Sequence, residues 1–313
     1  YAIQQVSFGK DSGGKTGTRT AAHGVQSVGI TTTFNLEQVF QLGQLEIYQD
    51  VEEVPDIEVS VERVIDEHIL LYTRCVDPAS PSGNKTISAI QNNKVDVFMN
   101  VHPDSADNAG DTAPDAIVHC SGMYLSSVSF NMATDGNLTE SITLVGNHKR
   151  WRQGTFHDVG TNTHWGAGTA FAASDVPRGM PTATNIDSKA TGAIVKRRQN
   201  VHITPPASAG GSDAKATSAT VSCDFGREQI NVLGARLPYH RYVSYPVEVT
   251  CDLEVVITDI RDQGITALPE ADNLSEEALS FVIKDDAGVS IATIDLGEIK
   301  NVNSIKFMQM AIE

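Results

Sequence analysis

The segment Gly9–Thr16 is the strongest candidate for chemistry in the sequence. It reads GKDSGGKT and matches the phosphate-binding pattern G-x-x-x-x-G-K-[ST]. In a working loop of this kind, backbone N–H groups surround the phosphates and the chain then enters a helix. The next residues, Gly17–Gly24, form a poor helix, and no alternation of strands and helices follows. Nucleotide binding therefore stays an alternative, and a Gly-rich N-terminal arm or loop is the preferred interpretation.

Histidine spacing gives no metal site. His148, His157 and His164 lie near Asp158, but their separations suit neither a helical site nor a tight loop site. No nucleophile elbow and no His-Glu-x-x-His sequence is present. We therefore predict no catalytic residue, no cofactor-binding residue, no metal ligand and no enzymatic activity.

The cysteines are too widely spaced for a zinc site or a disulfide framework. They form no C-x-x-C pair. We expect buried, reduced thiols of a protein made in the cytosol. The positions are Cys75, Cys120, Cys223 and Cys251.

The net charge limits the partners. The chain of 313 residues carries 39 acids and 23 Lys or Arg residues, a formal charge of −16. Such a surface repels a phosphate backbone, which argues against tight DNA or RNA binding but not against DNA in transit. No stretch approaches the ~18 apolar residues that cross a membrane, and no charged-then-apolar leader opens the sequence, so we expect a soluble protein without a membrane partner.

The elements that must position any site are strands. In 246–258, Val247 and alternate residues through Ile257 are apolar and the intervening residues are polar, a period of two that is typical of strands. The same alternation occurs at 57–62, 94–101, 127–132 and 220–225, and the last 35 residues predict strands at 279–284, 289–296 and 304–312. Thr134–Asn137 and Asp285–Gly288 predict hairpin turns.

Helical signals are few. Only Thr86–Gln91 and Ser275–Leu279 favour a helical turn or two. The fold class is therefore mainly β: an antiparallel β-sandwich or rolled β-barrel with one or two short helices and long loops. We expect residues 1–33 to form an N-terminal arm or loop with a first strand. Residues 34–313 would form a single β domain with a long polar insertion at about 147–192, and 193–204 could be a strand.

Charged clusters suggest contacts between copies of the chain. Two basic clusters stand out in the acidic sequence, and we predict inter-subunit contacts for them, with a nucleic-acid patch as the alternative. Their residues are Lys149, Arg150, Arg152, Lys196, Arg197 and Arg198. The run from Glu46 to Glu67 is rich in acids and reads either as a solvated face or as a wall that does not bind DNA.

Several segments of the sequence resemble tail-tube proteins of tailed phages. They are the segments 34–48 and 54–65, then 125–141, then 221–228 with 238–251, and the ending with Asp295-Leu-Gly297. Together they span nearly the whole chain, and the insertion between 147 and 192 matches least.

The resemblance implies a structural virion protein that forms stacked hexameric rings in the tail. Inner strands of each copy would join a ring-wide β-barrel around a bore through which DNA passes into the host. An acidic lining would repel DNA, and our candidates for it are Glu58, Glu62, Glu248, Asp252 and Glu254. The implied partners are other copies of the chain, tape-measure, tail-terminator and baseplate proteins, a sheath in a contractile tail, and DNA in transit without tight binding.

Other classes of protein stay open at this point. The tube of a related contractile injection device fits the same strand pattern. A cell-surface binding module is suggested by glycan-acceptor patterns at Asn84, Asn137 and Asn273. A nucleotide-binding protein rests on Gly9–Thr16 alone.

Overall fold

The computed structural model describes residues 4–10, 19–34, 36–43, 46–78, 93–102, 116–153, 194–204, 214–235, 237–257, 277–299 and 305–307. The elements are β1 (Gln4–Lys10), β2 (Arg19–Ala21), β3 (Val25–Thr33), β4 (Leu36–Phe40), β5 (Ile47–Glu52), β6 (Asp56–Val64), α1 (Leu71–Val76), β7 (Val95–Val101), β8 (Ala116–Ala133), β9 (Thr139–Gly146), β10 (His148–Gln153), η4 (Arg198–Asn200), β11 (Val201–Thr204), β12 (Ala214–Asp224), β13 (Arg227–Ile230), β14 (His240–Val243), β15 (Val249–Ile257), β16 (Glu277–Lys284), β17 (Ser290–Ile299) and β18 (Ile305–Phe307).

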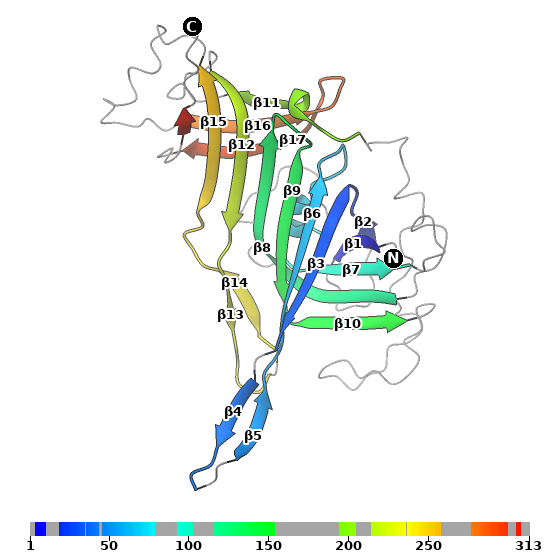
Figure 1. Cartoon of the computed structure of the whole chain (residues 1–313), viewed down its shortest axis with the longest axis vertical. Coiled ribbons are helices and arrows are strands. Elements are labelled where there is room, and N and C mark those ends of the chain that lie inside the picture. The colour runs from blue at the N-terminus through cyan, green and yellow to red at the C-terminus, as the bar shows by residue number, and fades with distance from the viewer. Residues whose placement is uncertain are drawn as a thin grey trace, which may run out of the picture.

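The long strand β8 belongs to two halves of one bent sheet. Its C-terminal half lies in the order β3-β6-β9-β8-β12-β15-β18, and its N-terminal half in the order β10-β8-β7-β1-β2. The bend falls at two glycines: Gly122 has a φ of +65°, and a Cβ on Gly146 would lie 2.3 Å from Met123 Sδ. A side chain would be strained at the first place and would lack room at the second, so the two glycines allow the sheet to curl into the half-barrel seen in Figure 1.

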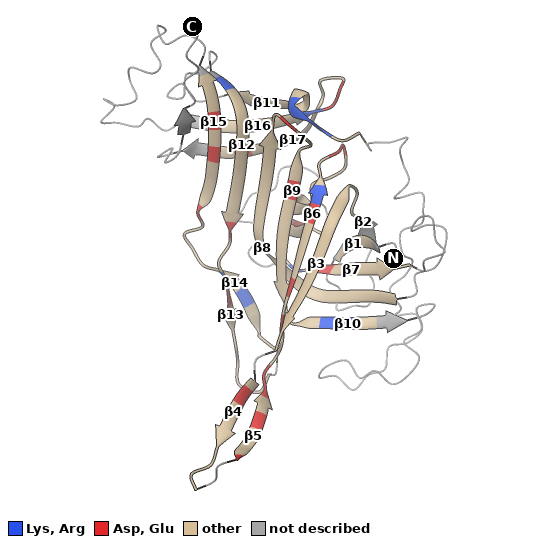
Figure 2. Cartoon of the chain, viewed as in Figure 1, with Lys and Arg blue, Asp and Glu red and all other residues tan. Residues whose placement is uncertain are grey.

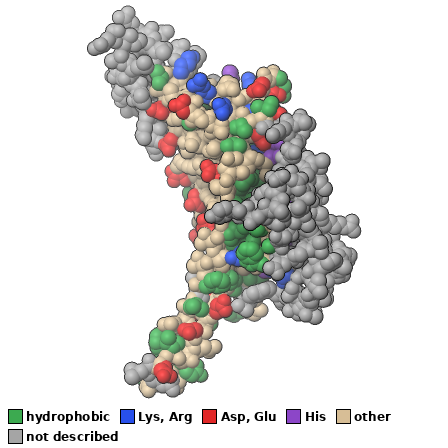
Figure 3. Space-filling view, turned by 45° about the vertical axis from the view of Figure 1, so that its right-hand side comes forward, with side chains coloured by type: hydrophobic (Ala, Val, Ile, Leu, Met, Phe, Trp, Pro, Cys, Tyr) green, Lys and Arg blue, Asp and Glu red, His purple; other side chains and the backbone are tan. Residues whose placement is uncertain are grey.

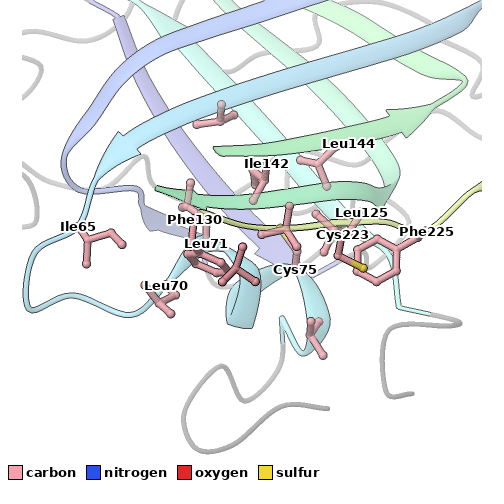
Figure 4. Close-up of a cluster of buried hydrophobic side chains, with 14 of the residues drawn as sticks. Ile65, Leu70, Leu71, Cys75, Leu125, Phe130, Ile142, Leu144, Cys223 and Phe225 are labelled. Carbon is pink, nitrogen blue, oxygen red and sulfur yellow. The ribbon is translucent and has the colours of Figure 1, made fainter. Parts of the chain in front are cut away.

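The core fills the space inside this bend. Alternate residues of β6, β9 and β12 point inward and are buried, among them Val59, Leu144 and Val221. Helix α1 covers the same cluster, and Figure 4 shows Leu71 and Cys75 facing the side chains of the sheet. The period-two pattern therefore gives these strands one apolar face. Helix α1 and the other half of the bent sheet cover this face.

Small sheets extend from both ends of this body. At the lower end of Figure 1 the β4–β5 hairpin projects beyond the body, and β13 pairs with β14 above it. At the upper end lies the sheet β11-β16-β17. Within the described residues, no helix is long and apolar enough to cross a membrane.

The predicted fold class is confirmed, and so are both hairpin turns. Gly136 and Gly288 take positive φ angles of 110° and 85° between paired strands. Of the two predicted helical turns, Thr86–Gln91 lies outside the described residues. The turn predicted at Ser275–Leu279 is wrong for its described part, because strand β16 begins at Glu277. The helix α1 was not anticipated from the sequence.

The described part of residues 1–33, for which an arm or loop with a first strand was predicted, contains the strands β1, β2 and β3. Strand β1 pairs with β7 over its whole length, and Val6 and Phe8 are buried in the core. Of the expected insertion at 147–192, residues up to Gln153 form β10 on the edge of β8, and 154–192 lie outside the described residues.

Candidate functional site

One face of the six-stranded sheet β3-β6-β9-β8-β12-β15 is polar and open to solvent. Strand register defines this face, because directly paired residues point to the same side. Glu62 pairs with Ser141, Ser141 with Ser129, Ser129 with Ser222 and Ser222 with Thr250. We call this surface the acidic face. Its described residues include Glu58, Ser60, Glu62, Ser127, Ser129, Asn131, Ser141, Thr143, Ser218, Thr220, Ser222, Asp224, Thr250, Asp252 and Glu254.

The face is acidic across its width. Glu58 and Glu62 are exposed on β6, and Asp224, Asp252 and Glu254 are exposed or half-buried on β12 and β15. Lys215, at the upper end of β12, pairs with Val256 and lies on the same side. Figure 2 shows the red positions of β6, β12 and β15 spread along the sheet. The excess of carboxylates gives this surface a negative potential.

Hydroxyl groups occupy the places between the acids. Ser222 Oγ lies 2.6 Å from Thr250 Oγ1, and Ser218 Oγ donates to Glu254 Oε2 at 3.0 Å. Ser27 Oγ donates to Glu62 Oε2 at 3.3 Å from the neighbouring strand. These neutral groups hydrogen-bond each other and the carboxylates. Among the described residues of the face, there is therefore no array of cations that could bind a phosphate backbone.

The sheet places most of the predicted acids together. Glu58, Glu62, Asp252 and Glu254 all lie on the acidic face, and Glu248 is exposed just before β15 begins. Asp224 joins them from β12 although it was not among the candidates. The alternation in 220–225 had marked it as polar, but only the pairing of β12 with β15 shows which acids it joins.

Among the described strands, few pair with the outer edges of the two strands that end the six-stranded sheet. Strand β3 pairs with β6 on one side, and no other described strand pairs with it. Strand β15 pairs with β12 on one side, and on the other only Leu253–Val255 pair with β18. Strand edges of this kind are templates for pairing with another chain.

The β4–β5 hairpin exposes apolar side chains far from the core. Phe40 is 66% exposed and Leu42 is 103% exposed. Figure 3 shows green side chains together with red ones along this projection. Exposed apolar patches of this kind mark contact surfaces. The exposed large apolar residues of the projection are Phe34, Leu36, Val39, Phe40, Leu42, Ile47, Tyr48 and Val51.

The predicted basic contacts fall in different environments. Lys196 departs from the prediction: it is fully buried, and its Nζ lies 2.8 Å from Glu67 Oε1, so its charge is paired inside the chain. Arg197 and Arg198 are exposed at the upper end, where Arg197 Nε donates to Asn137 Oδ1 at 3.1 Å. They remain candidates for contacts between copies.

The first basic cluster lies on β10. Lys149 Nζ donates to Thr32 Oγ1 at 2.5 Å, which ties β10 to β3. Arg150 Nε donates to His148 Nε2 at 3.2 Å. Arg152 lies in β10 as well. Lys149 and Arg150 therefore already contact side chains of their own chain.

The described ends of the phosphate-loop pattern do not have the required shape. Gly9 and Lys10 lie inside β1, where Gly9 pairs with Asp96, and the residues after the pattern form β2, antiparallel to β1. A phosphate loop needs a helix at this place. Residues 11–18, with Lys15 and Thr16, lie outside the described residues. The nucleotide-binding alternative is therefore not supported.

The described serine–histidine contact is not that of a nucleophile and its base. Ser121 Oγ lies 2.5 Å from His148 Nδ1, and His148 Nε2 accepts from Arg150 Nε. A neutral imidazole that accepts at Nε2 carries its proton on Nδ1, so it donates to Ser121 and cannot take that residue's proton.

The thiols are not activated either. Burial raises the pKa of Cys75 well above its usual range, and it raises the pKa of Cys120, Cys223 and Cys251 to about 11. Thiols in this state are poor nucleophiles and poor metal ligands. Among the described residues no group of three or more His, Cys, Asp or Glu side chains could hold a metal ion.

Comparison with known proteins finds only limited structural similarity. No family model matches the chain, and no curated protein does. Among solved structures, the chain is similar to one titled the anti-feeding prophage cap (AFP tube terminating cap), with 10% identity, a TM-score of 0.33, and coverage of 48% of this chain and 88% of that one. It is also similar to one titled the anti-feeding prophage baseplate, with 12% identity, a TM-score of 0.35, and coverage of 49% and 94%.

Proposed function

We propose that the protein is a tail-tube subunit, which assembles into stacked rings of six copies whose bore conducts phage DNA. One observation carries this proposal: in the described part of the chain, an antiparallel sheet of six strands has an acidic face that no other described strand covers, and at each end of the sheet most of the outer strand edge has no partner strand. Strands β3 and β15 run in opposite directions, because five antiparallel pairings separate them. When β3 of one copy lies beside β15 of the next, the antiparallel alternation continues.

Ring closure follows from these edges. Contacts that join unlike edges are head-to-tail, and a rotation that closes them gives a ring without exposed edges. At a strand spacing of about 4.8 Å, six strands cover an arc of about 29 Å. Six copies then enclose a backbone diameter of roughly 55 Å before strand tilt widens it. The number six comes from the resemblance to tail-tube proteins.

The acidic face suits the inner wall of such a ring. DNA that travels through a bore must be kept from sticking, and carboxylates such as Glu58, Glu62 and Asp252 repel phosphates. The hydroxyl groups between these carboxylates keep the surface hydrated and add no positive charge. On this proposal the chain has no catalytic or cofactor-binding role.

The apolar projection suits contact between rings. The β4–β5 hairpin extends along the long axis of the chain, so Phe40 and Leu42 of one ring would be buried against a copy in the next ring. Tape-measure, tail-terminator and baseplate proteins are the further partners, with a sheath if the tail contracts. The finished protein would reside in the virion tail after synthesis in the host cytoplasm. The tube of a related contractile injection device would have the same geometry.

Electron microscopy of the purified protein tests the proposal. We expect hollow rings or tubes with six-fold end views as concentration rises. The double variant Phe40→Glu with Leu42→Glu should stop tube growth, because these side chains are exposed in the single chain and apolar in the contact. The matched variant Phe40→Leu with Leu42→Met keeps an apolar surface and should still form tubes. A wild-type chain that stays monomeric even when assembly is seeded with tail-tip complexes would contradict the proposal.

A further inference from the structure

The short strand β18 covers part of the edge that ring formation needs. It pairs with β15 through Leu253–Ile305, Glu254–Lys306 and Val255–Phe307. This is the one parallel pairing among the described strands, and it is three residues long. The lower part of the same edge, Val249–Asp252, has no described strand beside it.

We propose that β18 is a guard strand, which closes the edge of β15 in the single chain and is displaced by β3 of a neighbouring copy. The inference rests on the proposed function and adds a control step to it. Parallel pairing is weaker per residue than antiparallel pairing, and a three-residue ladder holds few hydrogen bonds. Strand β3 offers an antiparallel partner long enough for all of Val249–Val255.

The competition depends on concentration. Strand β18 is tethered to the same chain, so at low concentration it occupies β15 before another copy can. At high concentration, or beside a ring already formed, β3 of a neighbouring copy forms the longer ladder with β15 and displaces β18. If only a fraction of chains has an open edge, the apparent affinity between copies is the intrinsic affinity multiplied by that fraction. The guard therefore delays spontaneous polymerisation.

Strand β3 has the properties that make such a guard useful. Its sequence, Val25–Thr33, contains no charged residue and no proline. Long, uncharged edges of this kind pair indiscriminately unless their partner edge is protected. The guard protects the partner edge.

Two variants test the guard strand. A chain that ends at Ile299 lacks β18, and we expect its critical concentration for assembly, measured by light scattering and microscopy, to fall by about tenfold. The variant Glu254→Cys with Lys306→Cys places two thiols at a directly paired position. Its oxidised form should stay monomeric, and its reduced form should assemble.

The outcomes separate the guard from the tube itself. If the oxidised form assembles like the reduced form, or if truncation abolishes assembly while the full chain still forms rings, the guard is overturned and the tube proposal stands. If neither the full chain nor the truncated chain forms rings under any condition, both are overturned. Circular dichroism and gel filtration of each variant first establish that it is folded.

Discussion

Arg63 and Glu140 form an ion pair that is completely removed from solvent. Arg63 Nε donates to Glu140 Oε2 at 2.8 Å, and both residues have an exposed fraction of 0%. The same carboxylate accepts from the backbone N–H groups of Leu71 and Tyr72 at 2.9 and 2.7 Å. A single side chain of β9 therefore joins β6 to the beginning of α1.

Replacing Glu140 with alanine should strongly destabilise the fold. The change leaves the guanidinium of Arg63 buried without its main partner and removes the acceptor for two backbone groups of α1. We expect the free energy of unfolding in urea to fall by about 3–5 kcal/mol. The double variant Arg63→Met with Glu140→Leu should lose less, because it buries no unpaired charge. Equal losses in both variants would show that packing, and not the charge, sets the effect.

The pair Lys196 and Glu67 should respond asymmetrically to mutation. Lys196 is fully buried, whereas the Glu67 side chain is 29% exposed. Glu67→Gln weakens the partner of a buried ammonium group, so we expect a loss of about 3 kcal/mol in the free energy of unfolding. Lys196→Met leaves a carboxylate that water can reach, and its loss should be less than half as large. Thermal and urea unfolding of the two variants would refute this if Lys196→Met is the more damaging change.

The sequence predicts strands where one face is buried and the other is exposed. Alternation is clear in β6 and β15, which line the acidic face. It fails in the first half of β8, where Val118 and His119 are both buried because the sheet is covered on both sides there. The full length of β8 could therefore not be predicted from periodicity.

Other features depend on residues distant in the sequence. Helix α1 has six residues, which are too few to show a helical pattern of apolar side chains in the sequence. The Glu140 carboxylate that binds its first N–H groups is about 70 positions away in the chain. The burial of Lys196 depends likewise on Glu67, 129 positions away. The acidic residues were found from alternation, but only strand register shows that they share one surface.

The stacked pair His23 and His68 should make stability depend on pH. Their ring centroids are 3.7 Å apart with an interplanar angle of 2°, and His68 Nδ1 lies 2.9 Å from Asp66 Oδ2. Burial, followed by the charge of His68, lowers the pKa of His23 below its usual 6.5. Arg63 and Arg74 lower it further, and Asp66 raises it.

The sign of this effect follows from proton uptake. The folded chain binds fewer protons at His23 than the unfolded chain does, so its contribution to stability is full above about pH 6.5 and falls as pH drops below that value. His23→Phe retains a ring but cannot titrate. We expect the free energy of unfolding of the wild type to fall more steeply from pH 7.5 to 5.5 than that of this variant. Parallel curves over that range would exclude a role for His23.

If the acidic face lines the bore of the proposed tube, reversing its charge should make the bore hold DNA. In assembled tubes, the triple variant Glu58→Lys, Glu62→Lys and Asp252→Lys replaces exposed carboxylates by ammonium groups on one surface of the sheet. We expect these tubes to retain short duplex DNA in a pelleting assay, with log affinity falling by about 0.9 per log unit of salt for each phosphate neutralised. The matched neutral variant, Glu58→Gln with Glu62→Gln and Asp252→Asn, removes the repulsion but supplies no cation, so it should retain little. DNA held inside the bore should also resist a nuclease too large to enter, which distinguishes it from DNA bound outside. Lysine tubes that retain no more protected DNA than the neutral tubes would show that the acidic face does not line the bore.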